Sequence, residues 1–133
     1  MIFEAIPNFS EGIREDVCRE LWDTAEAVPG GTVADLHVDR DHNRSVLTFL
    51  GGRNDVAEAA FRLAEKAIEK IDLTRHTGEH PRMGSIDVLP FVPLGNSTMD
   101  DAVDLARSVG KRIGMELDLP VFLYESAAQI PER

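Results

Sequence analysis

The sequence predicts an α+β domain in which one antiparallel-rich sheet carries helices on one of its faces. Short runs of β-forming residues alternate with segments of helical period, and glycine or proline lies at most of the joints. The chain has 133 residues, of which 43% are hydrophobic, and this suits a single globular domain.

The first half of the chain predicts strand, helix, strand and strand. A β-like run over Ile2–Ile6 is stopped by Pro7. Ser10 stands where a helix N-cap is expected. Apolar residues then recur on one helix face until Pro29-Gly30-Gly31: Ile13, Val17, Leu21, Ala25 and Val28. Further strands are expected over Thr32–Val38 and Arg44–Leu50, on either side of the loop Asp39–Asn43.

The second half predicts helix, strand, helix and strand. Asn54 is the expected cap of a helix with the apolar face Val56, Ala60, Leu63, Ala64 and Ala67. Ile71–Ser85 has no clean period. Ile86–Val92 returns to strand, and Pro90 and Pro93 mark it as an edge or bulged strand. Thr98 and Asp101 resemble a capping box before a helix through Ile113, and Pro120–Tyr124 is a last short strand.

The resulting order is β-α-β-β-α-β with an added α-β. The first six elements match the split βαβ, or ferredoxin-like, sandwich. Helices are expected on one face of its sheet, and the other face needs a cover that this chain does not obviously supply.

Composition excludes several classes of protein. The formal charge of −10 argues against a general nucleic-acid binder. No apolar run approaches the ~18–20 residues of a membrane span, and the N-terminus lacks the basic region of a signal peptide. The single Cys18 cannot form an internal disulfide, which favours a reducing, cytoplasmic setting.

The segment 72–84 is the strongest candidate for chemistry. It places Arg75, His76, His80 and Arg82 within eight positions of an acidic protein. Guanidinium groups bind carboxylates in a bidentate manner, and a histidine beside them can move protons near neutral pH. A solvated surface loop is the alternative. Zinc is disfavoured, because Gly78 and the proline after His80 break the helical geometry of a zinc motif.

Two weaker clusters lie earlier in the chain. Asp35, His37 and Asp39 would share one face of a strand, but the EF-hand template fails here, and a polar strand end explains the composition equally well. Asn8 and Ser10 precede the first helix, where backbone N–H groups can hold an anion, although an ordinary turn is the simpler interpretation.

Taken together, these motifs resemble the N-terminal subdomain of glutamate formiminotransferase. The matching runs are Pro7–Gly12, His42–Val46, Arg75–Gly84 and Leu123–Ala128. The resemblance covers essentially the whole chain. It implies two ferredoxin-like subdomains with a substrate cleft between them, and transfer of a formimino group from N-formiminoglutamate to tetrahydrofolate, the co-substrate, in histidine breakdown. Some members of the family handle N-formylglutamate.

The resemblance also implies roles for individual residues. The catalytic histidine of Gly-Glu-His-Pro-Arg is His80, acting as acid and base. Arg82, Arg75 and Arg44 are expected to hold substrate carboxylates, and Asn8, Ser10, His37 and Asp39 to bind substrate. Some relatives carry an assisting Asp where this chain has His37, so either Asp39 takes that role or the assisting group differs.

Two other functions stay open at this point. One is a non-catalytic folate-binding or assembly module that needs a partner chain, and the other is a metal-dependent hydrolase. In the family a second subdomain follows the segment that this chain matches. A second subdomain or partner chain is therefore expected, and an exposed sheet face favours a homo-oligomer.

Overall fold

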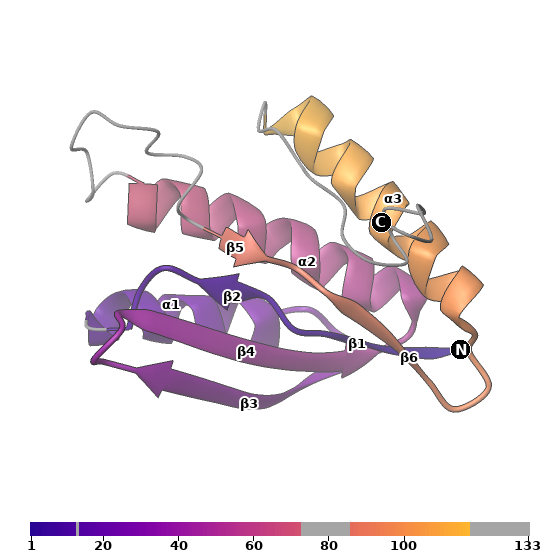
Figure 1. The fold of residues 1–133 in the computed structure, drawn as a ribbon, viewed down its shortest axis with the longest axis horizontal. Coiled ribbons are helices and arrows are strands. Elements are labelled where there is room, and N and C mark those ends of the chain that lie inside the picture. Colours follow the sequence, from indigo (N-terminus) through magenta and orange to yellow (C-terminus); the bar gives the residue numbers. More distant parts are fainter. Residues whose placement is uncertain (13, 73–85, 118–133) are drawn as a thin grey trace.

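The computed structural model describes residues 1–12, 14–72 and 86–117 (Figure 1). The predicted strand Pro120–Tyr124 lies outside them. The elements in chain order are β1 (Ile2–Ala5), β2 (Asn8–Phe9), α1 (Glu15–Glu26), β3 (Gly31–Asp39), β4 (Arg44–Gly51), α2 (Arg53–Ala67), the π-helical turn η1 (Ile68–Asp72), β5 (Ile86–Val88), β6 (Phe91–Leu94) and α3 (Met99–Glu116).

The described strands form one antiparallel sheet. β4 pairs with β3 on one side and with both β1 and β2 on the other, while β1 also pairs with β6 and β2 with β5. β1 with β2, and β5 with β6, act as two interrupted strands. We count β1 with β2 as the first strand, β3 as the second, β4 as the third, and β5 with β6 as the fourth. These strands lie side by side in the order fourth, first, third, second. This arrangement confirms the predicted α+β, ferredoxin-like fold.

Proline interrupts both composite strands without ending them. The first strand ends before Pro7 as predicted, but pairing resumes at Asn8 as β2, and the Pro7 carbonyl accepts a hydrogen bond from Leu47 N at 3.1 Å. The run predicted over Ile86–Val92 splits at Pro90, whose carbonyl accepts from Ile6 N at 3.0 Å. A proline carbonyl can still accept a bond although the residue has no N–H to donate.

Two of the three predicted helix caps were wrong. α1 begins at Glu15 with Arg14 as N-cap, so Ser10 lies too early to cap it. α2 begins at Arg53 with Gly52 as N-cap, in place of Asn54. The capping box of α3 is confirmed, since Asp101 N donates to Thr98 Oγ1 at 3.1 Å and Thr98 N donates to Asp101 Oδ2 at 2.9 Å.

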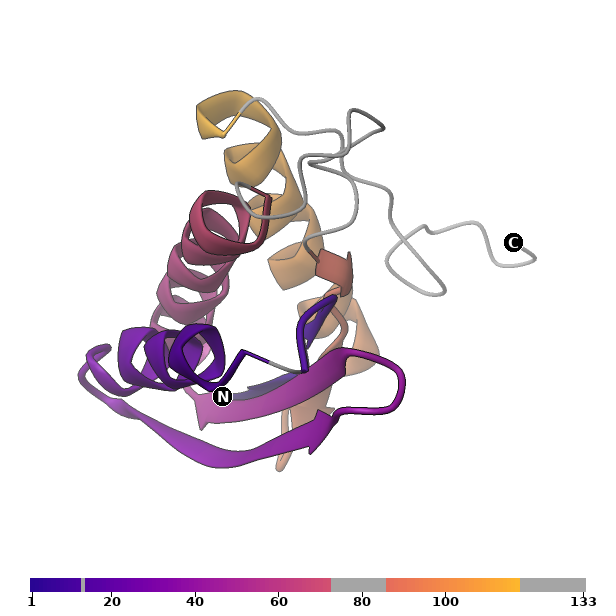
Figure 2. The same ribbon diagram turned by 90° about the vertical axis from the view of Figure 1, so that its left-hand side faces the viewer.

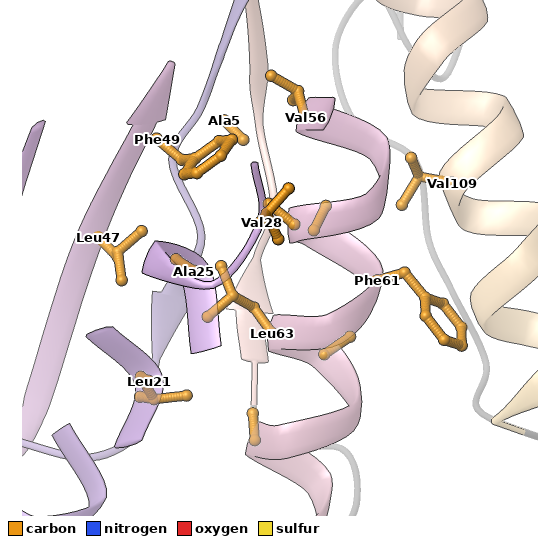
Figure 3. Close-up of a cluster of buried hydrophobic side chains, with 14 of the residues drawn as sticks. Ala5, Leu21, Ala25, Val28, Leu47, Phe49, Val56, Phe61, Leu63 and Val109 are labelled. Atoms are coloured by element: carbon orange, nitrogen blue, oxygen red, sulfur yellow. The ribbon is translucent and has the colours of Figure 1, made fainter. Parts of the chain in front are cut away.

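The core lies between one face of the sheet and the helices (Figure 2). Figure 3 shows Leu47 and Phe49 of β4 opposite Leu21 of α1 and Leu63 of α2, all fully buried. Burial of each such side chain contributes roughly 2 kcal/mol, so the helices hold the sheet firmly on this face. No helix among the described residues is long and apolar enough to cross a bilayer.

Candidate functional site

No described element covers the face of the sheet that points away from the helices. Along β4, buried Ser45, Leu47, Phe49 and Gly51 alternate with less buried residues that point to this open face. We call this surface the open face. The strand register places the following residues on it: Glu4 and Asn8; Thr32, Asp35, His37 and Asp39; Arg44, Val46, Thr48 and Leu50; Val92 and Leu94.

Two predicted binding residues flank one position of the open face. Asn8 of β2 and His37 of β3 are both register partners of Val46, one from each side of β4. The Asn8 side chain donates from Nδ2 to the Ile6 carbonyl at 3.0 Å, which fixes the orientation of its amide. His37 is exposed. The fold thus brings together an amide and an imidazole that are far apart in the sequence.

Asp39 and Arg44 form the next polar group, at the end of the β3–β4 hairpin. They are register partners, and Asp39 accepts hydrogen bonds from His42 N at 3.2 Å and His42 Nδ1 at 2.8 Å. The side-chain bond from His42 is the main cause that lowers the pKa of Asp39 below its usual value. Asp39 is therefore an anion at neutral pH, on the strand position opposite Arg44.

The loop after β2 is fastened to this hairpin and to α1. Gly12 N donates to Asn43 Oδ1 at 2.8 Å, and Asn43 adopts a left-handed φ of 53°. Glu11 is 5% exposed, and its carboxylate accepts from Arg14 N at 2.8 Å and Arg14 Nε at 3.1 Å. Its carbonyl accepts a weak bond from the Cys18 thiol at 3.8 Å. Ser10, partly buried, lies within this loop.

Arg14 connects the same loop to the end of α2. Its Nη2 donates to the Lys70 carbonyl at 3.2 Å, within the π-helical turn η1. π-helical turns are uncommon and occur frequently near functional sites. No role could be predicted for Glu11 or Arg14 from the sequence, because a charged pair three residues apart is usually a solvated surface pair. Only burial identifies this pair as structural.

The structure therefore assembles part of the predicted site. Asn8, His37, Asp39 and Arg44 lie on the open face, with Ser10 in the adjoining loop. Arg75, His80 and Arg82 lie outside the described residues, as does His76. Within the described ranges, no group of three His, Cys, Asp or Glu side chains is placed to hold a metal ion.

The open face combines apolar and polar groups in a way that suits an organic substrate. Val46, Leu50, Val92 and Leu94 provide apolar surface, while an amide, an imidazole, a carboxylate and a guanidinium lie at its polar end. Binding sites for small organic molecules typically combine apolar walls with a few such polar groups.

Comparison with known proteins identifies relatives over nearly the full chain. The family model for the formiminotransferase domain, N-terminal subdomain, matches residues 2–133. Glutamate formimidoyltransferase of Streptococcus pyogenes is 49% identical over 99% of the chain, and that of Thermoplasma acidophilum is 46% identical over 99%. Formimidoyltransferase-cyclodeaminase of Rattus norvegicus is 41% identical over 99%.

The matched region is only part of each relative. It spans 44% of the two glutamate formimidoyltransferases and 24% of the rat protein. The family model matches residues 2–133, and the identities to these relatives support the match. The chain therefore belongs to the family of formiminotransferase N-terminal subdomains.

Proposed function

We propose that this chain is the N-terminal half of a folate-dependent glutamate formimidoyltransferase. In this proposal it takes part in moving a formimino group from N-formiminoglutamate to tetrahydrofolate, in histidine breakdown in the cytoplasm. The observation that carries the proposal is the open face, which presents Asn8, His37, Asp39 and Arg44 together in a member of this family.

His80 is the proposed acid and base. The transfer requires a proton to leave the attacking nitrogen of tetrahydrofolate and a proton to reach the departing nitrogen of glutamate. A single imidazole with a pKa near neutrality can perform both transfers in turn. Its place in the Arg75–Gly84 run, which resembles the motif of the family, supports this assignment.

The arginines are proposed to hold carboxylates. Both substrates carry glutamyl carboxylate groups, and a guanidinium binds such a group with two parallel hydrogen bonds. Arg44 is one candidate, since it lies on the open face at the end of β4. Arg75 and Arg82 are the others, on the basis of sequence alone.

The polar side chains of the open face are proposed to orient the substrates. The fixed amide of Asn8 can offer its oxygen, and His37 can donate or accept on the other side of Val46. Ser10 is proposed to donate from the neighbouring loop. The ionised Asp39 replaces the assisting carboxylate that some relatives carry at the position of His37.

A second subdomain or partner chain is proposed to cover the open face. The chain matches 44% of the length of its bacterial and archaeal relatives, so the remaining part of each relative is longer than the matched part. The apolar strip of Val46, Leu50, Val92 and Leu94 gives such a cover a surface to pack on. The cleft between the two parts would then exclude water from the substrates.

The decisive experiment is formimino transfer by the complete enzyme with His80→Asn. We expect turnover to fall at least about 100-fold, because loss of a general acid–base typically removes this much. Lys111→Gln, on the exposed side of α3, is the matched control and should keep full activity. Unchanged thermal unfolding of His80→Asn would show that its fold is intact, and full turnover in that variant would refute the assignment.

The alternative of a non-catalytic folate-binding module is tested with the 133-residue chain alone. Binding of tetrahydrofolate, together with no transfer even after a second subdomain of the family is added, would favour the module. Restored transfer on addition of that subdomain would favour the proposed enzyme.

A further inference from the structure

The part of the chain that carries His80 is fastened on both sides to the loop that joins β2 to α1. This part lies between η1 and β5 in the sequence. Before it, the Lys70 carbonyl of η1 accepts a hydrogen bond from Arg14 Nη2 at 3.2 Å. After it, Ile86 begins β5 and is the register partner of Phe9 in β2 (Figure 1). Phe9 and Arg14 lie on the two sides of the same loop, so this loop contacts both neighbours of the part that carries His80.

A buried carboxylate holds the Arg14 side chain in place. Glu11 is 5% exposed, and it accepts from Arg14 N at 2.8 Å and from Arg14 Nε at 3.1 Å. Because a guanidinium group is planar and rigid, fixing Nε also fixes the direction of Nη2, which reaches the Lys70 carbonyl. Separating a buried charge from its partner is costly, so this arrangement is stable.

The Lys70 carbonyl lies in the last turn of the helix that α2 and η1 form together. η1 continues α2 from Ile68 to Asp72. Carbonyl groups in the last turn of a helix are commonly bound by donors from outside the helix. A donor that comes from another element also fixes the place of that turn in the fold. Arg14 therefore sets the point from which the chain continues towards His80.

Glu20 of α1 makes a second contact with the same turn, and this contact is weaker. Its carboxylate oxygens lie 3.7 Å from Lys66 Nζ and 3.6 Å from Lys70 Nζ. The side chains are partly exposed, and ion pairs of this kind contribute little. They also join side chains, whereas Arg14 binds the backbone itself. Glu20 is therefore a matched control for Arg14.

We propose that Arg14 is a positioning residue for formimino transfer. Held by Glu11, it anchors the chain before His80, while the pairing of Ile86 with Phe9 anchors the chain after it. This inference rests on the acid–base role proposed for His80. Displacement of a reacting group by about 1 Å can cost a large factor in rate. Loss of the anchor should therefore lower kcat more than it raises KM.

Steady-state kinetics of the complete enzyme with Arg14→Lys test the proposal. Lysine keeps a positive charge beside Glu11 but has no rigid fork that reaches two acceptors at once. We expect kcat to fall about 10-fold and KM for each substrate to change by less than about 3-fold. Glu20→Gln removes the ion pairs to the same turn and should keep the kcat of the unaltered enzyme.

Glu11→Gln provides a second variant, which decides the question if Arg14→Lys does not fold. Glutamine has the shape of glutamate but offers Arg14 one acceptor oxygen in place of two, so the guanidinium is held less firmly. The Arg14 side chain is 35% exposed, so its charge stays in contact with water. We expect kcat to fall about 3-fold. Thermal unfolding of each variant shows whether it is folded.

Combination with His80→Asn separates this inference from the proposed function. If Arg14 acts through His80, Arg14→Lys should cause no further loss of kcat in the His80→Asn enzyme, because no acid–base group remains there to be displaced. A further loss of about 10-fold in that background would overturn the inference and leave the role of His80 intact. Full turnover by His80→Asn alone would overturn both.

Two other results would overturn the proposal. One is an unchanged kcat in folded Arg14→Lys, or in folded Glu11→Gln where the lysine variant does not fold, whatever happens to KM. The other is an equal loss of kcat in Glu20→Gln, which would indicate a general effect of charge at the end of α2.

Discussion

The backbone N–H of Gly12 meets the side-chain oxygen of Asn43 at 2.8 Å, although the two residues are 31 positions apart. This bond joins the loop after β2 to the turn between β3 and β4. Asn8 lies just before the loop and Arg44 just after the turn. One hydrogen bond therefore helps to set the separation between the two sides of the candidate site.

Serine substitutions at two glycines should have opposite effects on stability. A Cβ on Gly12 would lie within 2.6 Å of the Asp39 carbonyl oxygen, among backbone atoms that cannot move aside. We expect Gly12→Ser to lower the free energy of unfolding by about 2 kcal/mol or more. At Gly52 the nearest atom is the Met1 carbonyl oxygen at 3.7 Å, and this residue is the N-cap of α2.

Gly52→Ser should therefore raise the free energy of unfolding by about 0.5 kcal/mol, through a new cap bond and a less flexible unfolded chain. Urea unfolding of both variants measures the difference. Equal effects at the two glycines would contradict the close packing described for Gly12.

Asn43 should respond to substitution in a defined order. Asn43→Asp keeps the acceptor for Gly12 N and should change stability least. Asn43→Gly keeps the left-handed backbone and loses only the bond, at a cost of about 1 kcal/mol. Asn43→Ala loses the bond and strains the backbone, at a cost of about 2 kcal/mol in total. Chemical denaturation of the three variants tests the order, and an alanine variant as stable as glycine would refute it.

Glu58 should make the free energy of unfolding depend on pH at values below the ordinary pKa of a glutamate. Hydrogen bonds from Arg112 and Arg62 lower the pKa of Glu58 from its ordinary value of 4.5. A carboxyl group with a lowered folded-state pKa stabilises the fold above its unfolded pKa, and the effect is lost as pH falls through the folded pKa.

The difference in unfolding free energy between the protein and Glu58→Gln should therefore be constant above about pH 4.5 and shrink as the pH falls further. Denaturation at a series of pH values from 7 to 3 follows this change. Glu65→Gln, at an exposed position of the same helix, is the matched control. A difference that stays constant down to pH 3 would argue against the ion-pair network.

Cys18 should react slowly with a thiol reagent in the folded protein. Burial raises the pKa of its thiol, and the nearby Glu11 carboxylate raises it further. The thiolate is the reactive form, so little of it is present at pH 8. We expect the reaction with Ellman's reagent to be slow in buffer and fast in urea. Ser108→Cys in a Cys18→Ser background places an exposed thiol on α3 and should react rapidly in both conditions.

Local pattern predicted most of the fold. The alternation over Arg44–Leu50 and the helical spacing from Val56 to Ala67 identify β4 and α2, because a two-residue and a 3.6-residue period are distinct. Thr98 and Asp101 identified the cap of α3, because both partners of the box lie within one turn. Ser10 failed as a cap, because α1 begins only at Glu15, beyond the reach of the Ser10 side chain.

The site was predicted in its residue types and only partly in its arrangement. Asp35, His37 and Asp39 were expected on one strand face, and the register confirms this. That Asn8 and His37 flank Val46 could not be derived, because it depends on the pairing of three separated strands. The bond from Arg14 to the Lys70 carbonyl likewise depends on where α2 and η1 end relative to α1, which no local pattern encodes.

The position of β1 between β4 and β6 delays completion of the fold during synthesis. Ile2 pairs with Leu94, and its backbone bonds to Ser97, a residue 95 positions further along the chain. Such high contact order slows folding, since the entropy of closing a long loop is lost before the pairing forms. On the ribosome β1 can pair with β4 early, but its other edge stays unpaired until β6 emerges about 90 residues later, and an unpaired edge is open to aggregation or chaperones in the interval.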